Sequence, residues 1–130
     1  MKKHLLKGEK FMITNCKIEN NGKTIAWDYQ GSRLNKNYNF NIYFVVSKSN
    51  DYIVVVEPDN SFSPDNAVIF YPDGAEKKGI INPCRDKGVV CFGDAYYVVD
   101  EITLISICDR ANYACALNSD GDVVKVYETR

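Results

Sequence analysis

Hydrophobic and polar residues alternate with a period of two along much of this chain. Two stretches show the pattern best, NYNFNIYF (residues 37–44) and TIAWDY (residues 24–29), in which every second residue is apolar or aromatic. Successive side chains of a β-strand point to opposite faces of its sheet, so the alternation predicts half-buried strands. No stretch shows helical periodicity for more than about two turns. The pattern therefore predicts a chain built from strands.

One stretch lacks the alternation. DYIVVVE (residues 51–57) is a continuous run rich in β-branched residues. Such runs are typical of strands that are covered on both faces, because both sets of side chains are then buried. We therefore expect a strand at residues 52–57 in the interior of the fold.

Turn signals separate these runs at short intervals. Asn21-Gly22 lies between two strand-like segments, and residues 72–74 (PDG) and 119–121 (SDG) each end in a glycine that can adopt a left-handed conformation. Turns and alternation together predict an all-β fold, an antiparallel meander of about ten short strands that forms a sandwich or an open barrel. The predicted strands cover residues 11–19, 24–30, 38–46, 52–57, 66–71, 76–82, 89–92, 95–99, 102–108, 113–118 and 122–128.

Length and composition fit one folded domain. The chain has 130 residues, of which 45% are hydrophobic, and its formal net charge is −1. A domain of this size can bury a core without metals or disulfides. We expect a basic N-terminal tail at residues 1–10 and a single β domain at residues 11–130, with Met12 as an alternative start of translation. The nearly balanced charge argues against nucleic-acid or membrane-surface partners, which need a basic surplus.

The compartment is predicted from the N-terminus and the thiols. Only Leu5 and Leu6 follow the first lysines before charge returns, whereas a secretory signal needs about 7–15 apolar residues. No apolar run approaches the roughly 20 residues that span a bilayer. The five cysteines are an odd number, which argues against a disulfide framework. We therefore expect a cytoplasmic protein.

Four cysteines fall in two similar stretches, CRDKGVVC (residues 84–91) and CDRANYAC (residues 108–115). Both spacings are wider than the two to four residues that usually separate zinc ligands. The chain has one histidine, His4, which lies in the predicted tail, so no imidazole is at hand to complete a mixed site. We expect no metal site and interpret these cysteines as small buried hydrophobic residues.

Hairpin geometry gives each cysteine pair an expected position. A two-residue turn within the first stretch would place Cys84 directly opposite Cys91, where an oxidant could join them. A four-residue turn within the second stretch would place Cys108 and Cys115 diagonally on one face, roughly 7–8 Å apart. That separation exceeds the usual distance for a disulfide, so we expect the second pair to stay unbridged.

No set of residues suited to catalysis is found. His4 is the one ordinary imidazole base, and it lies where order is least expected. The carboxylate pairs Asp100-Glu101 and Asp120/Asp122 fall at turns and are interpreted as solvated. The stretch NSDGDVV resembles a calcium-binding loop, but Val123 occupies the place of its central glycine. Nucleotide-binding and metalloprotease motifs are missing as well. We therefore expect neither an enzyme nor a bound cofactor.

The longest predicted loop, EPDNSFSPDN (residues 57–66), favours binding. It carries three acids around an aromatic residue: Glu57, Asp59, Phe62 and Asp65. An exposed aromatic anchor surrounded by carboxylates suits a protein partner with a basic groove. The alternative is a solvated loop whose Phe62 lies in the core.

The last third of the chain, ITLISICDRANYACALNSDGDVVKVYETR, resembles the end of small β-rich bacterial immunity proteins that accompany secreted toxins. The similar features are the Arg110–Tyr113 turn after a strand, an acidic Asp-Gly turn and the terminal ETR. NAVIFYPDG and IINP, within residues 66–83, add to the resemblance, which covers about half of the chain. Residues 1–65 depart from it.

The resemblance implies a function. Immunity proteins of this kind, including those of contact-dependent growth inhibition systems, act in the cytosol, where each binds one cognate toxin domain, often a nuclease, and covers its active site. The alternative is a stand-alone carbohydrate- or peptide-binding β-domain. A sugar-binding module would place several aromatic residues on one exposed face, whereas the single tryptophan, Trp27, alternates with Ile25 and Tyr29 as a core residue does.

Overall fold

The computed structural model describes residues 12–57 and 63–129. This part of the chain forms eleven antiparallel strands and one short 3-10 helix, η1 (Arg85–Lys87). The strands make three sheets, and in each sheet neighbours in sequence are neighbours in space. Every sheet is open, so the predicted all-β antiparallel meander is confirmed in the form of stacked sheets. No helix in the described ranges has the length and apolarity needed to cross a membrane.

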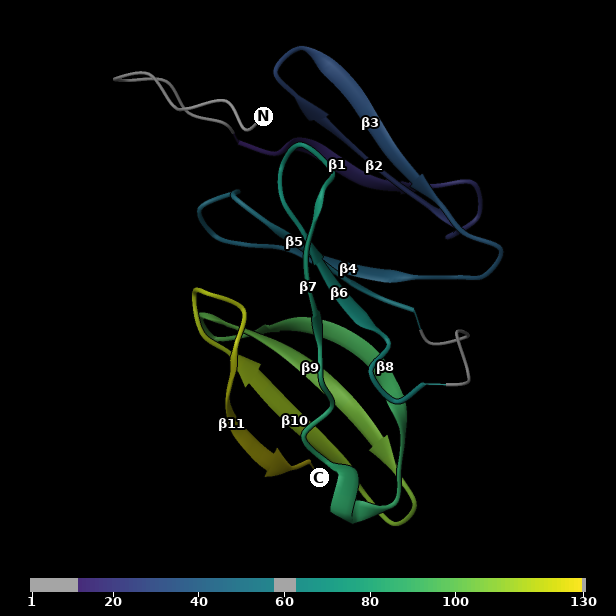
Figure 1. Cartoon of the computed structure of the whole chain (residues 1–130), viewed down its shortest axis with the longest axis vertical. Coiled ribbons are helices and arrows are strands. Elements are labelled where there is room, and N and C mark those ends of the chain that lie inside the picture. The colour runs from purple at the N-terminus through teal and green to yellow at the C-terminus, as the bar shows by residue number, and fades with distance from the viewer. Residues whose placement is uncertain (1–11, 58–62, 130) are drawn as a thin grey trace.

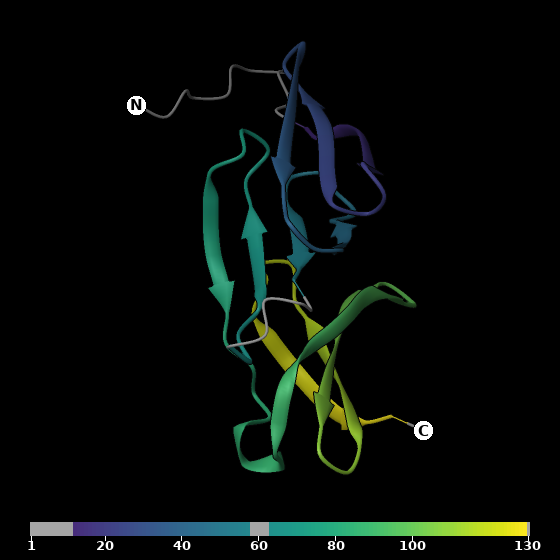
Figure 2. The same ribbon diagram turned by 90° about the vertical axis from the view of Figure 1, so that its right-hand side faces the viewer.

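The three sheets follow one another along the chain without interleaving. The N-terminal sheet contains β1 (Thr14–Glu19), β2 (Thr24–Tyr29) and β3 (Ser32–Asn37). The middle sheet contains β4 (Tyr43–Val46), β5 (Ile53–Val56), β6 (Ala67–Phe70) and β7 (Glu76–Ile80). The C-terminal sheet contains β8 (Val89–Val98), β9 (Glu101–Cys108), β10 (Asn112–Leu117) and β11 (Val123–Glu128). Figures 1 and 2 show the sheets in this order along the long axis of the molecule.

The middle sheet is buried on both faces. All four residues of β5 are 0% exposed. Val54 and Val56 belong to the core shared with the C-terminal sheet, whereas Ile53 and Val55 belong to the core shared with the N-terminal sheet. The prediction that this continuous apolar run is covered on both faces is therefore confirmed.

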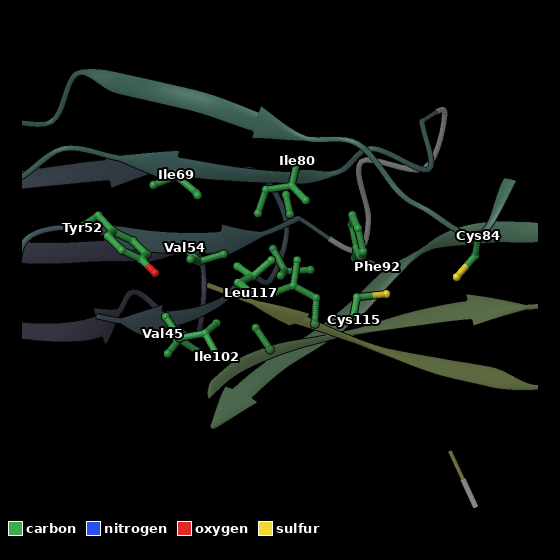
Figure 3. Close-up of a cluster of buried hydrophobic side chains, with 14 of the residues drawn as sticks. Val45, Tyr52, Val54, Ile69, Ile80, Cys84, Phe92, Ile102, Cys115 and Leu117 are labelled. Carbon is green, nitrogen blue, oxygen red and sulfur yellow. The ribbon is translucent and has the colours of Figure 1, made fainter. Parts of the chain in front are cut away.

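The core between the middle and C-terminal sheets is made of aliphatic side chains, two aromatic rings and sulfur (Figure 3). Its buried members are Val45, Tyr52, Val54, Val56, Ala67, Ile69, Ile80, Cys84, Phe92, Ala95, Ile102, Leu104, Cys108, Cys115 and Leu117. Each large side chain that is fully buried here contributes about 1.5–3 kcal/mol to the free energy of unfolding.

The core between the middle and N-terminal sheets is centred on Trp27, which is 0% exposed. Ile25, Phe70 and Ile53 belong to the same cluster. The Trp27 indole Nε1–H donates a hydrogen bond of 2.7 Å to the backbone oxygen of Pro72 in the β6–β7 turn. Trp27 therefore links the N-terminal sheet to the middle sheet. Its burial agrees with the prediction that it is a core residue.

The strand predicted at residues 38–46 is wrong in extent. β4 covers Tyr43–Val46 only, and residues 38–42 are not in a strand. The alternation still reports burial correctly, because Tyr38 and Phe40 pack against the second core and Ile42 is buried in it. An irregular connecting segment that packs against a core can show the same alternation of apolar and polar residues as a strand.

Two further predictions about strands need correction. β3 was not expected, because its sequence SRLNKN contains one apolar residue, Leu34, which packs on the core beside β2. The strands predicted at residues 89–92 and 95–99 are one long strand, β8, whose register shifts twice. These irregularities let a single strand bend along β9 without interrupting the pairing.

The cysteine hairpins differ from their predicted registers. Cys84 precedes η1, and Cys91 pairs with Ile107, so the predicted Cys84–Cys91 pairing is wrong. The second turn has two residues rather than four, since the Cys108 N–H donates to the Ala111 oxygen at 3.2 Å. All five cysteines are free thiols, and four of them are buried, as expected of small hydrophobic residues.

Candidate functional site

The N-terminal sheet leaves its outer face to solvent, and that face is polar. Arg33 forms ion pairs with Asp28 at 3.0 Å and with Glu19 at 3.2 Å. The Asn15 side chain donates to Asp28 at 2.7 Å. This hydrogen bond and the one from Arg33 lower the pKa of the Asp28 carboxyl group. Polar groups that pair with one another suit a solvated face and leave little apolar surface for a partner.

The outer face of the C-terminal sheet is not packed against another sheet either, and it is more apolar, although it also carries Asp94, Thr103 and the Glu101–Lys125 ion pair. Ile102 and Leu104 point into the core, so the residues between and beyond them on β9 point away from it. The register of the sheet places apolar side chains from all four strands beside them. We call this set the apolar face: Tyr96, Val98, Ile105, Ile107, Ala114, Ala116 and Tyr127.

The apolar face has aromatic residues towards both edges of the sheet. Tyr96 is 44% exposed on β8, and Tyr127 is 40% exposed on β11. Between them Ala116 is almost fully buried. The Lys125 ammonium group reaches from β11 across β10 to Glu101 on β9 at 3.0 Å, so its stem covers the small residues below it. Large, rigid side chains around a packed centre are typical of the anchors of protein interfaces.

A glycine shapes this surface at the second register shift of β8. A β-carbon added to Gly93 would overlap Cδ1 of Ile107. The side chain of Ile107 therefore lies over the backbone of β8, in space that any other residue at position 93 would fill. Ile107 is 36% exposed in this position.

The β8–β9 hairpin ends in a strained and exposed valine. Val98 pairs with Glu101, which leaves Val99 and Asp100 as a two-residue turn. Val99 has a φ of 56°, a conformation that hairpins usually give to glycine, and it is 90% exposed. Positive φ is an outlier for a β-branched residue, and such strain is concentrated at functional sites.

Tyr97 lies on the other side of the same hairpin. Its hydroxyl group donates to the backbone oxygen of Val46 at 2.6 Å and closes one wall of a hollow of about 260 Å³ between the sheets. Lys48 and Asp100 form an ion pair at the rim, and Tyr52 lines the interior. Burial raises the pKa of both tyrosines. The hollow is therefore lined by groups that already have partners inside the chain.

Sheet edges are a second place where a partner can bind, because an edge strand exposes unpaired backbone groups. β1 carries an irregular register and Asn15 at a φ of 51°, β3 carries Arg33 and Lys36, and β7 carries Lys77 and Lys78. Bulges and exposed cations are devices that discourage edge pairing.

The edges of β4 and β8 are occupied from within the chain. β4 has four residues, and its Val46 oxygen accepts the Tyr97 hydroxyl group. On β8 the Asn66 side chain replaces a neighbouring strand. It accepts the Phe92 N–H at 2.7 Å and donates to the Phe92 oxygen at 2.8 Å.

The edge of β11 is less protected, because its register shift is confined to the start of the strand at Val123 and its cation, Lys125, is paired with Glu101 across the sheet. Val124 is 56% exposed and Val126 is 40% exposed, and β10 is the one strand beside β11. The Thr129 N–H donates to the Asn112 oxygen of β10 at 2.9 Å. Backbone groups alternate in direction along a strand, so the N–H and C=O groups of Val126 and Glu128 point away from the sheet. These groups form an open pairing edge.

The acidic residues predicted as a binding site are placed in part. Asp59 and Phe62 lie outside the described residues. Asp65 accepts the Asn82 N–H at 2.7 Å and forms an ion pair with Arg85, so both carboxylate oxygens have partners inside the chain. The Glu57 N–H donates to the Asn66 oxygen at 2.9 Å.

The Glu57 carboxylate has a partner as well. Burial raises the pKa of the Tyr38 hydroxyl group, and the nearby Glu57 carboxylate raises it further. Because Asn66 joins this segment to β8, Glu57 and Asp65 lie at the edge of the C-terminal sheet opposite β11.

Of the other carboxylates noted in the sequence, Asp100, Asp120 and Asp122 lie at exposed turns, whereas Glu101 begins β9 and is half-buried. Asp122 forms an ion pair with Lys78 and thereby ties the β10–β11 turn to β7. Within residues 12–57 and 63–129, no three His, Cys, Asp or Glu side chains lie close enough together to hold a metal ion.

Comparison with known proteins gives one structural similarity. No protein-family model matches the chain, and no curated protein matches it in sequence. A chain in the structure of Tne2 in complex with Tni2 is similar, with a TM-score of 0.63. The match covers 83% of this chain and 78% of that chain at 13% sequence identity. At this identity the similarity concerns the fold.

Proposed function

We propose that this chain is an immunity protein that binds a cognate secreted bacterial toxin domain and neutralises it by covering its active site. The observation that carries the proposal is the fold, which is similar over most of its length to a chain from a structure of two proteins in complex. The resemblance of residues 102–130 to immunity proteins supports the same function. A reducing cytosol suits the five free thiols.

Physical features of the surface support inhibition by binding rather than by catalysis. The apolar face offers two exposed tyrosines, Tyr96 and Tyr127, on a sheet whose other face is packed into the core. Such a surface changes little on binding, so a partner loses little free energy in ordering it. A partner that buries about 800 Å² on each side would form a complex of standard size.

Growth rescue tests the proposed function. The open reading frame adjacent to the gene would be expressed from an inducible promoter, with and without this chain. We expect the toxin to arrest growth, the chain to restore it, and the two proteins to co-purify as a stable complex. A nuclease assay with increasing amounts of this chain would then test whether the toxin is a nuclease and whether this chain inhibits it. If the two proteins neither associate nor rescue growth, the proposal fails.

The acidic segment is a second proposed contact with the toxin. We expect the double substitution Asp59→Ala and Asp65→Ala to weaken binding more than the same change at Asp120 and Asp122, because desolvated charge pairs contribute more than exposed ones. Calorimetry on both double variants measures the difference. Asp65 also holds the Asn82 N–H, so Asp65→Asn, which keeps an acceptor oxygen, is the control for folding. Equal affinities would exclude this segment as a contact while leaving the proposed function intact.

The alternative is a stand-alone carbohydrate- or peptide-binding domain. Trp27 is fully buried and does not contribute to such a site, but Tyr96 and Tyr127 are exposed on one face. Binding of the isolated chain to a glycan or peptide array, together with failure of growth rescue, would favour this alternative.

A further inference from the structure

The strands β5 and β9 both carry apolar residues on each of their faces, but their surroundings differ. β5 reads IVVV and is covered on both faces, whereas β9 reads EITLISIC and is covered on one. Ile105 and Ile107 point away from the core, where a half-exposed strand normally carries polar residues. The second half of β9 therefore has the sequence of a strand with a second cover, whereas the described residues supply one cover only at this place.

The β11 edge meets this surface. Tyr127 belongs to the apolar face and to the edge strand, and it pairs with Ala114, which is the neighbour of Ile105 across the sheet. The outward backbone groups of Val126 and Glu128 lie on either side of Tyr127 along β11. The open edge and the apolar face therefore form one continuous surface with a corner at Tyr127.

We propose that an extended segment of the toxin domain pairs with β11 as a fifth strand of the C-terminal sheet, and that the adjoining part of the toxin covers the apolar face. This inference rests on the proposed function and names the surface that performs it. Backbone hydrogen bonds to Val126 and Glu128 would fix the register of the added strand, and the side chains beside it would select the partner.

A second copy of this chain fits the surface less well. Two copies joined by their β11 edges around a two-fold axis would continue the sheet, so both apolar faces would stay exposed to water. A different domain can add a strand and fold over the face at the same time. Glu128 beside the edge and Asp94 on the same side as Tyr96 favour basic residues in the toxin segment.

Proline substitution tests the strand pairing directly. Val126→Pro and Val126→Ala both remove the valine side chain, but only the proline removes the outward N–H group. We expect Val126→Ala to bind the toxin nearly as the parent does and Val126→Pro to bind it at least tenfold more weakly. Calorimetry with the purified toxin domain gives the affinities, and circular dichroism shows that each variant is folded.

A proline on another edge is the matched control. The Tyr38 N–H donates to the Lys23 oxygen at 2.9 Å, so the N–H of Asn35 on β3 points away from its sheet. We expect Asn35→Pro to leave the affinity unchanged. A similar loss of affinity with this variant would mean that proline acts through stability, and the β11 pairing would lose its support.

Hydrogen exchange provides a measurement that needs no variant. In the complex of the parent chain with the toxin, the amides of Val126 and Glu128 should exchange at least tenfold more slowly than in the free chain. Unchanged exchange at both amides, or equal binding by Val126→Pro and Val126→Ala, would overturn the pairing while the immunity function survives. A dimer of the free chain that Val126→Pro abolishes would instead assign the edge to a second copy. If the parent chain binds no toxin, the proposed function itself fails.

Discussion

Two buried asparagines hold the irregular parts of this chain in place. The Asn66 side chain bonds to both backbone groups of Phe92 and to the Glu57 oxygen, and the Asn82 side chain accepts the Cys84 N–H at 3.0 Å. Both lie at the ends of predicted strands, residues 66–71 and 76–82, next to turns. Sequence patterns could not single them out, because an asparagine that satisfies its own turn and one that completes a distant strand look the same.

Val99 gives a prediction about stability. We expect Val99→Gly to raise the free energy of unfolding by about 1 kcal/mol. The relief of an unfavourable φ, worth about 1–3 kcal/mol, exceeds the entropy that glycine adds to the unfolded chain. Urea unfolding followed by circular dichroism measures the change.

The adjacent residue provides the control for Val99. Val98 lies in β8 with ordinary strand geometry, so Val98→Gly should lower the stability. If both glycines are destabilising to a similar extent, the turn is not strained at Val99.

At the scale of strands, patterns located the sheets better than the site. Asn21-Gly22 correctly predicted the β1–β2 hairpin, and the continuous apolar run of β5 correctly predicted a strand buried on both faces. Turn residues and two-sided burial can both be recognised directly in the sequence. β3 left none, since its polar residues face solvent and a single leucine joins it to the core.

The uncovered surface was missed for a related reason. An apolar residue shows in the sequence that it avoids water, but not whether its own chain covers it. Ile105 looks like a core residue until the register shows that it points away from the core. The apolar residues of β9 could have revealed it, because the C-terminal sheet is the last of the three and no further sheet follows in the sequence to cover its outer face.

Trp27 gives a prediction about how the sheets are joined. Trp27→Phe removes the indole N–H, leaves the Pro72 oxygen without this donor and opens a cavity, so we expect a loss of about 2–4 kcal/mol. Phe70→Leu is the control, because it removes volume from the same core without breaking a hydrogen bond. Thermal and urea unfolding of both variants should show the larger loss for Trp27→Phe. Equal losses would mean that the hydrogen bond to the β6–β7 turn contributes little.

The free energy of unfolding of the whole molecule depends on pH in the alkaline range, because thiols are buried in it. Burial, with the neighbouring Cys84, raises the pKa of Cys115 from 9.0 to about 12. Burial likewise raises the pKa of Cys16 to about 11. Between pH 9 and these values the unfolded chain loses thiol protons that the folded chain retains. The free energy of unfolding should therefore fall as pH rises above 9, by up to about 1.4 kcal/mol per pH unit for each thiol.

Cys115→Ala isolates the contribution of one thiol. The alanine variant starts from a lower stability because of the cavity, but its stability should fall less steeply between pH 9 and 11 than that of the parent. Tyrosines and lysines titrate in both proteins, so they cancel in the difference of slopes. Parallel curves would show that Cys115 does not resist ionisation in the folded chain.

The order of the sheets along the chain has a consequence for synthesis. Because no sheet borrows a strand from another, each layer is complete as soon as its own stretch has left the ribosome. The N-terminal and middle sheets can therefore associate while the C-terminal sheet is still being translated, and one face of the middle sheet then waits uncovered. β11 is translated after every other strand described here. The β11 edge that we propose as the toxin contact is therefore absent from a nascent chain until Val123–Glu128 has left the ribosome.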